Sequence, residues 1–240
     1  MLQYVYERAS LARYLTSTIV ATDDERVYAA ARNFGALVRM TRPDHPSGTD
    51  RVAEVASAET AEIVVNIQGD EPLIDPAAID AAILPMVHDP DMQMCTLKKR
   101  IEDPQEITDP NVVKVVTDRS GDAIYFSRSP IPYVRHPLPD GRGSVVTSAP
   151  RSGSGSDGIY FKHIGLYVYR RAFLLEYPAL PMGPLERAER LEQLRALENG
   201  HRLHVVETEY ESLGVDTPED LARVSRLFEV TTMQGVHANG

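Results

Sequence analysis

The sequence has one cysteine, fewer basic than acidic residues, and no long apolar run. Because Cys95 is the only cysteine, no disulfide can form within the chain, as in proteins of a reducing cytoplasm. The 25 Lys and Arg against 35 Asp and Glu give a formal net charge of −10, which argues against a broad nucleic-acid surface. No stretch approaches the length of a membrane span, and residues 1–15 lack the apolar core of a signal peptide. We therefore expect a cytoplasmic protein that binds neither nucleic acid nor membranes.

The order of apolar patterns predicts an α/β fold. The 240 residues suffice for one such domain, and 42% hydrophobic with 25% charged residues is ordinary for a globular protein. The first half predicts helices over residues 1–15, 24–34 and 49–58, and strands over 18–21, 36–40 and 63–67. This alternation implies a mixed, mostly parallel sheet with helices on both faces.

The second half continues the same domain to about residue 230. The pattern predicts helices over 76–88 and 184–199 and from 217 onward, and strands over 94–99, 111–118, 123–127, 160–170 and 203–207. Residues 138–158 are rich in Gly, Ser and Pro, so we expect a mobile loop within one domain. Residues 231–240 carry no pattern and are expected to fray.

The strand over 63–67 organises the chain because two carboxylates follow it. Gly69 interrupts the β-branched run, Asp70 and Glu71 come next, and Pro72 ends regular pairing. Ligands of open α/β sheets bind at the carboxyl ends of strands, and carboxylates there suit Mg²⁺. The alternative is a solvated acidic turn. Asp216, between Gly214 and a predicted helix start, offers a second metal carboxylate or, alternatively, ordinary helix-start chemistry.

Residues 160–170 suggest where a ligand could lie. Alternation places Ile164, Leu166 and Val168 on one face of the strand, and an aromatic set that includes His163 and Tyr167 on the other. Gly165 leaves a gap on the second face where a ligand could approach the backbone; the alternative is a half-buried aromatic surface. In the helix over 184–199, Glu192 and Gln193 flank the apolar stripe and could face a pocket.

Six motifs in order resemble the 3-deoxy-manno-octulosonate (Kdo) cytidylyltransferase family. They are HPSGTDR at 45–51, QGDEP at 68–72, YFSR at 125–128, KHIGLYVYR at 162–170, LEQLR at 191–195 and GVDTPEDL at 214–221. The resemblance spans residues 1–230 and implies a Rossmann-like, Mg²⁺-dependent, cytoplasmic homodimer. It implies that the Kdo anomeric hydroxyl attacks the α-phosphorus of CTP, giving pyrophosphate and CMP-Kdo for lipopolysaccharide biosynthesis.

The resemblance also implies roles for particular residues. Asp70 and Asp216 would be the metal carboxylates and so the catalytic pair. Ser47, Gly48, Arg51 and Gln68 would form the cytidine site. Arg128, His163, Tyr167, Glu192 and Gln193 would form the sugar site. Chemically, Arg128 and His163 can meet a sugar carboxylate, and the Glu192–Gln193 pair can hold hydroxyls.

One feature of the family has no counterpart in the sequence. The family opens with a strand and a loop containing PAR and a GKPL-like stretch, which gives the triphosphate an Arg and a Lys, whereas here Met1 falls at the first helix. In the doubly wound order that strand would lie between the strands over 18–21 and 63–67. We therefore expect a chain that is poorly soluble or partly unfolded and inactive as written. The alternatives are a cytidylyltransferase for another acidic sugar, such as sialic acid, and a catalytically silent dimer.

Overall fold

The computed structural model describes residues 1–135, 159–215 and 217–237. The predicted loop over 138–158 and the predicted metal ligand Asp216 lie outside the described residues. Within the described part of the chain, no helix has both the length and the apolar character needed to cross a membrane.

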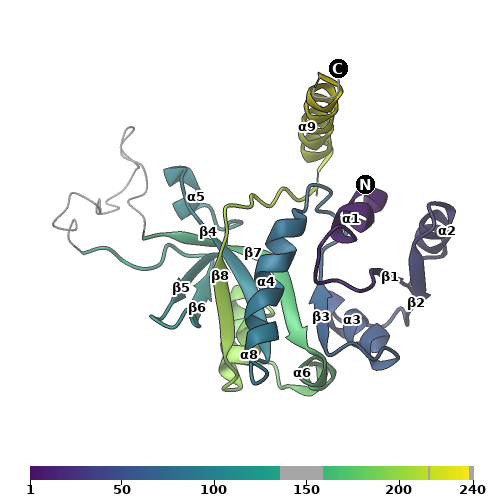
Figure 1. The fold of residues 1–240 in the computed structure, drawn as a ribbon. Helices are drawn as coiled ribbons and strands as arrows, with labels where there is room; N and C mark the ends of the chain where they lie inside the picture. Colours follow the sequence, from purple (N-terminus) through teal and green to yellow (C-terminus); the bar gives the residue numbers. More distant parts are fainter. Residues whose placement is uncertain (136–158, 216, 238–240) are drawn as a thin grey trace.

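The strands form two separate sheets (Figure 1). The smaller sheet pairs β1 (Ile19–Thr22) with β2 (Leu37–Met40) in parallel. The larger sheet contains β3 (Ile63–Asn66), β4 (Met94–Arg100), β5 (Lys114–Thr117), β6 (Ala123–Ser127), β7 (Phe161–Arg170) and β8 (Leu203–Glu207). Its order is β6-β5-β7-β4-β8, and β3 also pairs with β7. Because β7 runs antiparallel to β3, β4 and β5 while β8 is parallel to β4, four of the six strands point the same way. The predicted mixed α/β fold is confirmed.

Helices cover both faces of the larger sheet (Figure 1). The helices are α1 (Leu2–Ala9), α2 (Glu25–Asn33), α3 (Gly48–Ser57), α4 (Pro76–His88), α5 (Pro104–Thr108), α6 (Arg171–Glu176), α7 (Pro184–Glu189), α8 (Leu194–Glu198) and α9 (Pro218–His237), with a 3-10 turn η1 (Tyr177–Ala179). Local chemistry explains several starts. The side chains of Asp24, Ser47 and Asp75 accept backbone N–H groups in the first turns of α2, α3 and α4.

The core lies on the two faces of β7, as its alternation predicts. Ile164, Leu166 and Val168 pack in one apolar cluster that includes residues of α4 and α1. Tyr169 and Tyr167 belong to the cluster on the opposite face, with residues of α3, α6 and α8. The central strand is therefore covered on both sides, and its position is fixed by burial on each face.

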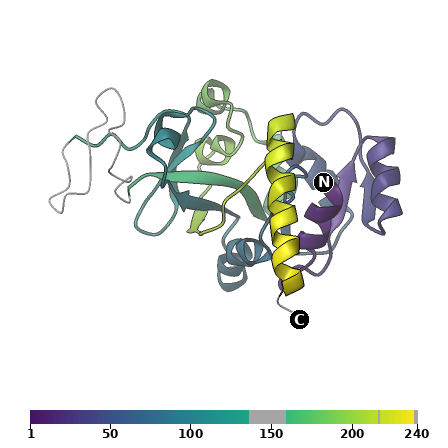
Figure 2. The same cartoon turned by 90° about the horizontal axis from the view of Figure 1, so that it is seen from above.

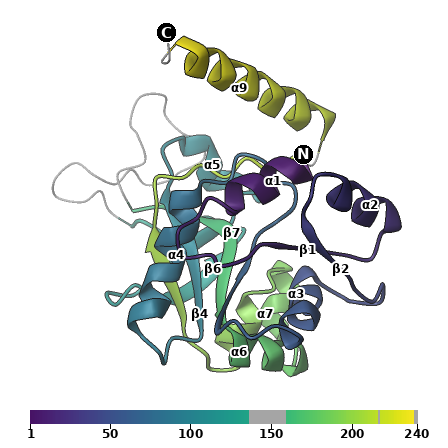
Figure 3. The ribbon, with the colours of Figure 1, turned by 45° about the vertical axis from the view of Figure 1, so that its right-hand side comes forward.

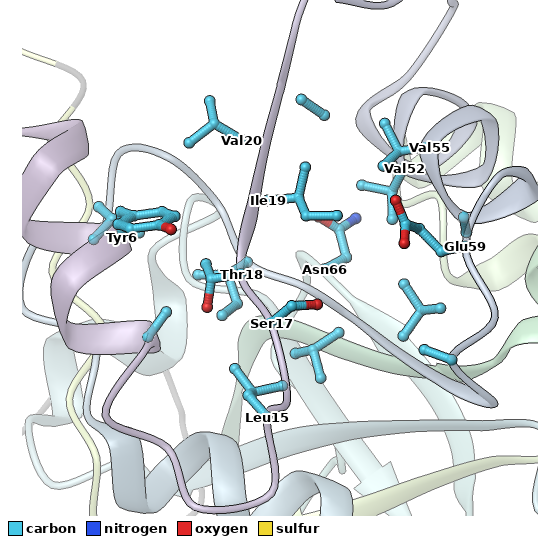
Figure 4. Close-up of a pocket in the computed structure, with 18 of the residues that line it drawn as sticks. Tyr6, Leu15, Ser17, Thr18, Ile19, Val20, Val52, Val55, Glu59 and Asn66 are labelled. Carbon is cyan, nitrogen blue, oxygen red and sulfur yellow. The ribbon is translucent and has the colours of Figure 1, made fainter. Parts of the chain in front are cut away.

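A gap separates the two sheets, because β1 and β3 do not pair with each other. A cavity of about 330 Å³ lies between them and is lined by residues of both strands, of α1 and of α3. Figure 4 shows Ile19 and Val20 of β1 facing this space, with Val52 and Val55 of α3 across it and Tyr6 of α1 at one side. These are the two strands between which the sequence analysis placed the first strand of the family.

Three predicted boundaries are wrong. The first helix ends at Ala9 instead of residue 15; at its end the Ser10 hydroxyl donates to the Tyr6 carbonyl, 2.7 Å away, and its oxygen lies 3.1 Å from Thr18 Oγ1, from which it can accept. The predicted helix over 184–199 is two short helices, α7 and α8, broken at Arg190. Helix α9 continues to His237, past the predicted start of a patternless tail. It lies outside the body formed by the sheets (Figures 1 and 3), and from above it runs across the molecule near α1 (Figure 2).

Candidate active site

A second cavity, of about 340 Å³, lies beside β7. It collects six residues that the sequence analysis assigned to substrates: Gly48, Gln68, His163, Tyr167, Glu192 and Gln193. Seven other lining residues carried no assigned role: Thr49, Asn66, Gly165, Tyr169, Tyr177, Arg190 and Leu191. Only Gly165 had a sequence signal, the gap it leaves in an aromatic strand face.

The cavity exists because one edge of β7 is paired at both ends and open in the middle. The His163 backbone N–H donates to the Val113 carbonyl, 2.8 Å away, and pairing with β3 starts at Tyr167. Between them, a Cβ added at Gly165 would meet nothing within 4 Å. A ligand can therefore approach the β7 backbone at Gly165, as predicted.

The His163 ring is neutral, and Thr96 fixes which of its nitrogens carries the proton. The Thr96 hydroxyl lies 2.8 Å from the Leu166 carbonyl, 3.1 Å from the Ile164 carbonyl and 2.9 Å from His163 Nε2. Because its single proton serves a carbonyl, its oxygen accepts from the ring, which assigns the imidazole proton to Nε2. Desolvation lowers the pKa of His163 to about 3, so the ring carries no charge at pH 7. His163 therefore offers a hydrogen-bond acceptor at Nδ1 instead of a positive charge.

Glu192 connects the predicted sugar and cytidine residues. Ser47 Oγ, which also caps α3, lies 3.2 Å from Glu192 Oε1, and Thr49 makes a further hydrogen bond to this carboxyl group. The Tyr177 hydroxyl donates to the Glu192 carbonyl, 2.7 Å away. Desolvation raises the pKa of Glu192 despite these bonds. The N-terminus of α3 and the wall formed by residues 190–193 are thus joined directly.

The break between α7 and α8 places residues 190–193 on the cavity wall. Buried Glu186 and Arg195 form an ion pair of 2.6 Å that folds α8 back onto α7. Glu198 accepts the backbone N–H groups of Leu185 and Glu186 at 2.8 and 2.9 Å. Arg190 turns the chain between the helices with a left-handed backbone, φ 54° and ψ 48°.

The two neighbouring carboxylates after β3 differ in burial and in hydrogen bonding. Glu71 is buried and accepts the Tyr210 hydroxyl at 3.1 Å, and burial raises its pKa. Asp70 is half-buried, and within the described residues no hydrogen bond or ion pair engages its carboxylate. The Val215 N–H donates to the Asp70 carbonyl, 3.0 Å away, so the chain just before Asp216 runs beside Asp70. Asp70 is therefore the carboxylate of this pair that remains available to a cation.

The metal site stays a prediction. Across residues 1–135, 159–215 and 217–237, no group of three His, Cys, Asp or Glu side chains is placed to hold a metal ion. Asp216 is outside that range. An unengaged carboxylate beside the segment that leads to Asp216 is a donor set suited to Mg²⁺ completed by phosphate oxygens.

Three predicted residues lie away from the cavity wall. Arg51 pairs with Asp23 at 3.1 Å, bonds to Thr41, and lines the gap between the sheets. Ser47 contacts the wall through Glu192 only. Arg128 donates to the carbonyls of Glu189 and Pro110 at 2.8 and 2.9 Å. Their assigned roles in binding substrate stay predictions.

A Rossmann-like sheet with a free carboxylate after β3, and a polar cavity at the start of α3, defines a nucleotide-binding α/β enzyme. The chain belongs to the cytidylyltransferase family, whose family model matches residues 1–206. A 3-deoxy-manno-octulosonate cytidylyltransferase of Solibacter usitatus (strain Ellin6076) is 72% identical over 236 residues, covering 98% of this chain and 87% of the relative. The enzyme of that name from Geobacter sulfurreducens is 54% identical over 224 residues, covering 93% of this chain and 87% of the relative.

Solved structures agree with this family. The structure of a CMP:2-keto-3-deoxy-manno-octonic acid synthetase complexed with CTP superimposes with a TM-score of 0.84 at 40% identity, covering 96% of this chain and 88% of the other. A 4-diphosphocytidyl-2C-methyl-D-erythritol synthase from Anaerococcus prevotii, 12% identical with a TM-score of 0.58 and covering 95% of this chain and 88% of the other, shares the fold alone.

Proposed function

We propose that the protein transfers a cytidylyl group from CTP to Kdo, giving CMP-Kdo and pyrophosphate for lipopolysaccharide biosynthesis. The observation that carries the proposal is the cavity that joins the residues assigned to cytidine, Gly48 and Gln68, with four assigned to the sugar. The relatives that share 72% and 54% of residues bear the name of this activity.

The reaction requires positioning more than covalent help from the protein. The anomeric hydroxyl of Kdo loses its proton to solvent, its oxygen forms a bond to the α-phosphorus, and the bond from that phosphorus to the bridging oxygen breaks as pyrophosphate leaves. Residues 190–193 and the β7 residues His163 and Tyr167 would hold the sugar, and the start of α3 with Gln68 would hold the nucleotide. His163 Nδ1 can accept a hydrogen bond from a sugar hydroxyl, because Thr96 fixes the other nitrogen as a donor.

Mg²⁺ belongs to the proposal as the cofactor. Asp70 and Asp216 would hold it, and when bound it would offset the negative charge of the phosphates. The chain's own contribution is to leave the Asp70 carboxylate unpaired while Glu71 is held by Tyr210. A homodimer and a cytoplasmic location are further parts of this proposal and rest on the family resemblance.

Pyrophosphate release tests the proposal. The assay would contain CTP and Mg²⁺ with Kdo, with sialic acid, or without sugar. We expect release with Kdo only. The 240-residue chain and a form extended at its N-terminus by the strand and loop that the resemblance implies would be assayed side by side. Release with sialic acid would favour the other acidic sugar, and no release from either form would favour a silent protein.

A further inference from the structure

The charge balance of the second cavity raises the question of what would bind an acidic sugar. Among the described residues that line it, Arg190 is the only Lys or Arg. Arg128 does not line this cavity, and its side chain donates to two backbone carbonyls outside it; His163, which does line it, is neutral. Glu192, in the same wall, would repel a carboxylate when ionised.

Arg190 also has an unusual backbone. Of the described residues other than glycine, it alone has a positive φ, 54°. Its backbone N–H donates to the Glu186 carbonyl, 2.8 Å away, and ends α7. A left-handed conformation costs a side-chain-bearing residue roughly 1–2 kcal/mol, and glycine or asparagine usually occupies such a helix end. A long cationic side chain at this position is unfavourable for the backbone, and strain of this kind concentrates at functional sites.

The side chain of Arg190 is free to bind. The residue is exposed, and no hydrogen bond or ion pair to its guanidinium is found within the described residues. Its neighbours in sequence, Leu191, Glu192 and Gln193, also line the cavity, so the turn brings the cation and the hydroxyl-binding pair to one wall. A guanidinium binds a carboxylate through two parallel hydrogen bonds, a geometry that lysine cannot reproduce.

We propose that Arg190 binds the carboxylate of the acidic sugar and is a specificity-determining residue of this cavity. The inference rests on the proposed function for the identity of the sugar. It assigns to Arg190 the contact that sequence reasoning gave to Arg128 and His163. The break after α7 then does more than reverse the chain, because it places the carboxylate-binding group at the cavity.

The Arg190→Gly variant distinguishes a role of Arg190 in sugar binding from a purely structural role. Glycine adopts the left-handed conformation without strain, so a purely structural role predicts an equal or higher melting temperature and unchanged sugar binding. The proposal predicts an equal or higher melting temperature together with weaker binding. We expect the Kd for Kdo, measured calorimetrically without CTP so that no turnover occurs, to rise about 10- to 100-fold, as for loss of a charge-assisted pair. Arg190→Lys should recover part of the affinity.

Arg187→Gln and Arg190→Gln form the matched pair, since both arginines are exposed and belong to the same turn of chain, but only Arg190 lines the cavity. We expect only the second to weaken Kdo binding. Calorimetry would use the 240-residue chain and the extended form, because the cavity is built from residues 48–193 in both. In the extended form the KM for Kdo should rise while the KM for CTP stays within about twofold.

The outcomes distinguish this inference from the proposed function. Unchanged Kdo affinity in Arg190→Gly, or an equal loss of affinity for Kdo and CTP, would overturn the role of Arg190 and leave the reaction intact. Kdo binding that depends on Arg190 without pyrophosphate release would support Arg190 and contradict the reaction. A parent protein that does not bind Kdo would overturn both.

Discussion

At the residue scale, adjacent side chains in this protein serve separate purposes. Asp70 and Glu71 follow the same strand, yet Glu71 is buried against Tyr210 and Asp70 is left to solvent and ligands. Glu192 and Gln193 both line the cavity, while Arg195, two residues on, is buried in an ion pair behind it. Each role follows from what the side chain contacts, so substitutions at neighbouring positions should have different effects.

Asp70→Asn should abolish turnover and leave the fold intact, because a lost ligand charge weakens transition-state stabilisation at a metal site. Pyrophosphate release and far-UV circular dichroism of the extended form would measure the two properties. Glu71→Gln is the matched control and should retain turnover, because the amide oxygen can still accept the Tyr210 hydroxyl. Near-parental turnover by Asp70→Asn would remove Asp70 from the metal site.

Gln193→Ala should raise the KM for Kdo much more than the KM for CTP. Gln193 is buried in the cavity wall, and loss of a hydrogen-bonding group there costs about 1–3 kcal/mol when its partner stays buried. Steady-state kinetics with each substrate varied would test this. Gln68→Ala should show the reverse preference, and equal effects of Gln193→Ala on both substrates would place it outside the sugar site.

Thr96→Val should destabilise the protein and weaken sugar binding together. Thr96 is fully buried, and valine would leave His163 Nε2 and the Ile164 and Leu166 carbonyls without this hydroxyl, at a cost of about 1–3 kcal/mol. Thr96→Ser keeps the hydroxyl and is the control. Thermal melts and the Kd for Kdo would be compared. A valine variant that binds Kdo as the parent does would show that His163 needs no positioning by Thr96.

At the element scale, the segment from α7 to α8 is held in place by contacts on its side away from the cavity. The ion pair between Glu186 and Arg195 is buried, and the Arg195 guanidinium also lies 5.4 Å from the Tyr177 ring centroid. The Glu186 carboxylate raises the pKa of Arg195, which keeps it charged. This pair therefore holds the backbone of residues 190–193 from the side opposite the ligand.

Arg195→Met should destabilise the protein by about 3–5 kcal/mol, because Glu186 would remain buried without a counter-charge. Chemical denaturation gives the free energy of unfolding. Replacing both partners, with Glu186→Gln and Arg195→Met, should restore part of the loss. Arg187→Met, on the exposed side of α7, should change stability by less than about 0.5 kcal/mol. An Arg195→Met variant as stable as Arg187→Met would mean that the ion pair does not hold the two helices together.

Elements with local causes could be predicted from the sequence, and those with distant causes could not. Asp24, Ser47 and Asp75 cap helices through bonds within three residues, and β7 alternates along its own length. The break at Arg190 had no local signal, because Leu191, Leu194 and Leu197 also fit one continuous helix. Likewise, the separation of Asp70 from Glu71 depends on Tyr210, which is distant in the chain. Six assigned residues share the cavity, but Arg190 was missed for this reason.

At the scale of the whole molecule, the smaller sheet is joined to the larger one by packing instead of strand pairing. Leu2 and Tyr6 of α1 contact the cluster beside β1 and β2, whereas Val5 and Ala9 belong to the cluster of the larger sheet. Helix α1 therefore bridges the two parts. The gap between β1 and β3 leaves their facing backbone edges without strand partners among the described residues.

A strand added so that it pairs with β1 and β3 across this gap should stabilise the protein. Buried backbone groups without partners cost about 1–3 kcal/mol each, and several approach the 5–15 kcal/mol that stabilises a typical domain. A form that carries such a strand should melt at a higher temperature and bind less hydrophobic dye than the 240-residue chain. Equal melting temperatures and equal dye binding of the two forms would contradict this prediction.

The separation of the cavity wall from its support also bears on how such an enzyme could acquire a new substrate. Glu186, Arg195 and Glu198 hold the turn without lining the cavity, and Arg190 lines the cavity without those bonds. The residues that support the turn and the residue that binds at the cavity can therefore be substituted separately. A library restricted to residues 190 and 193 would sample new sugars while Leu191 stays in the core and Glu192 keeps its bonds to the start of α3, with the charge at position 190 deciding between acidic and neutral sugars.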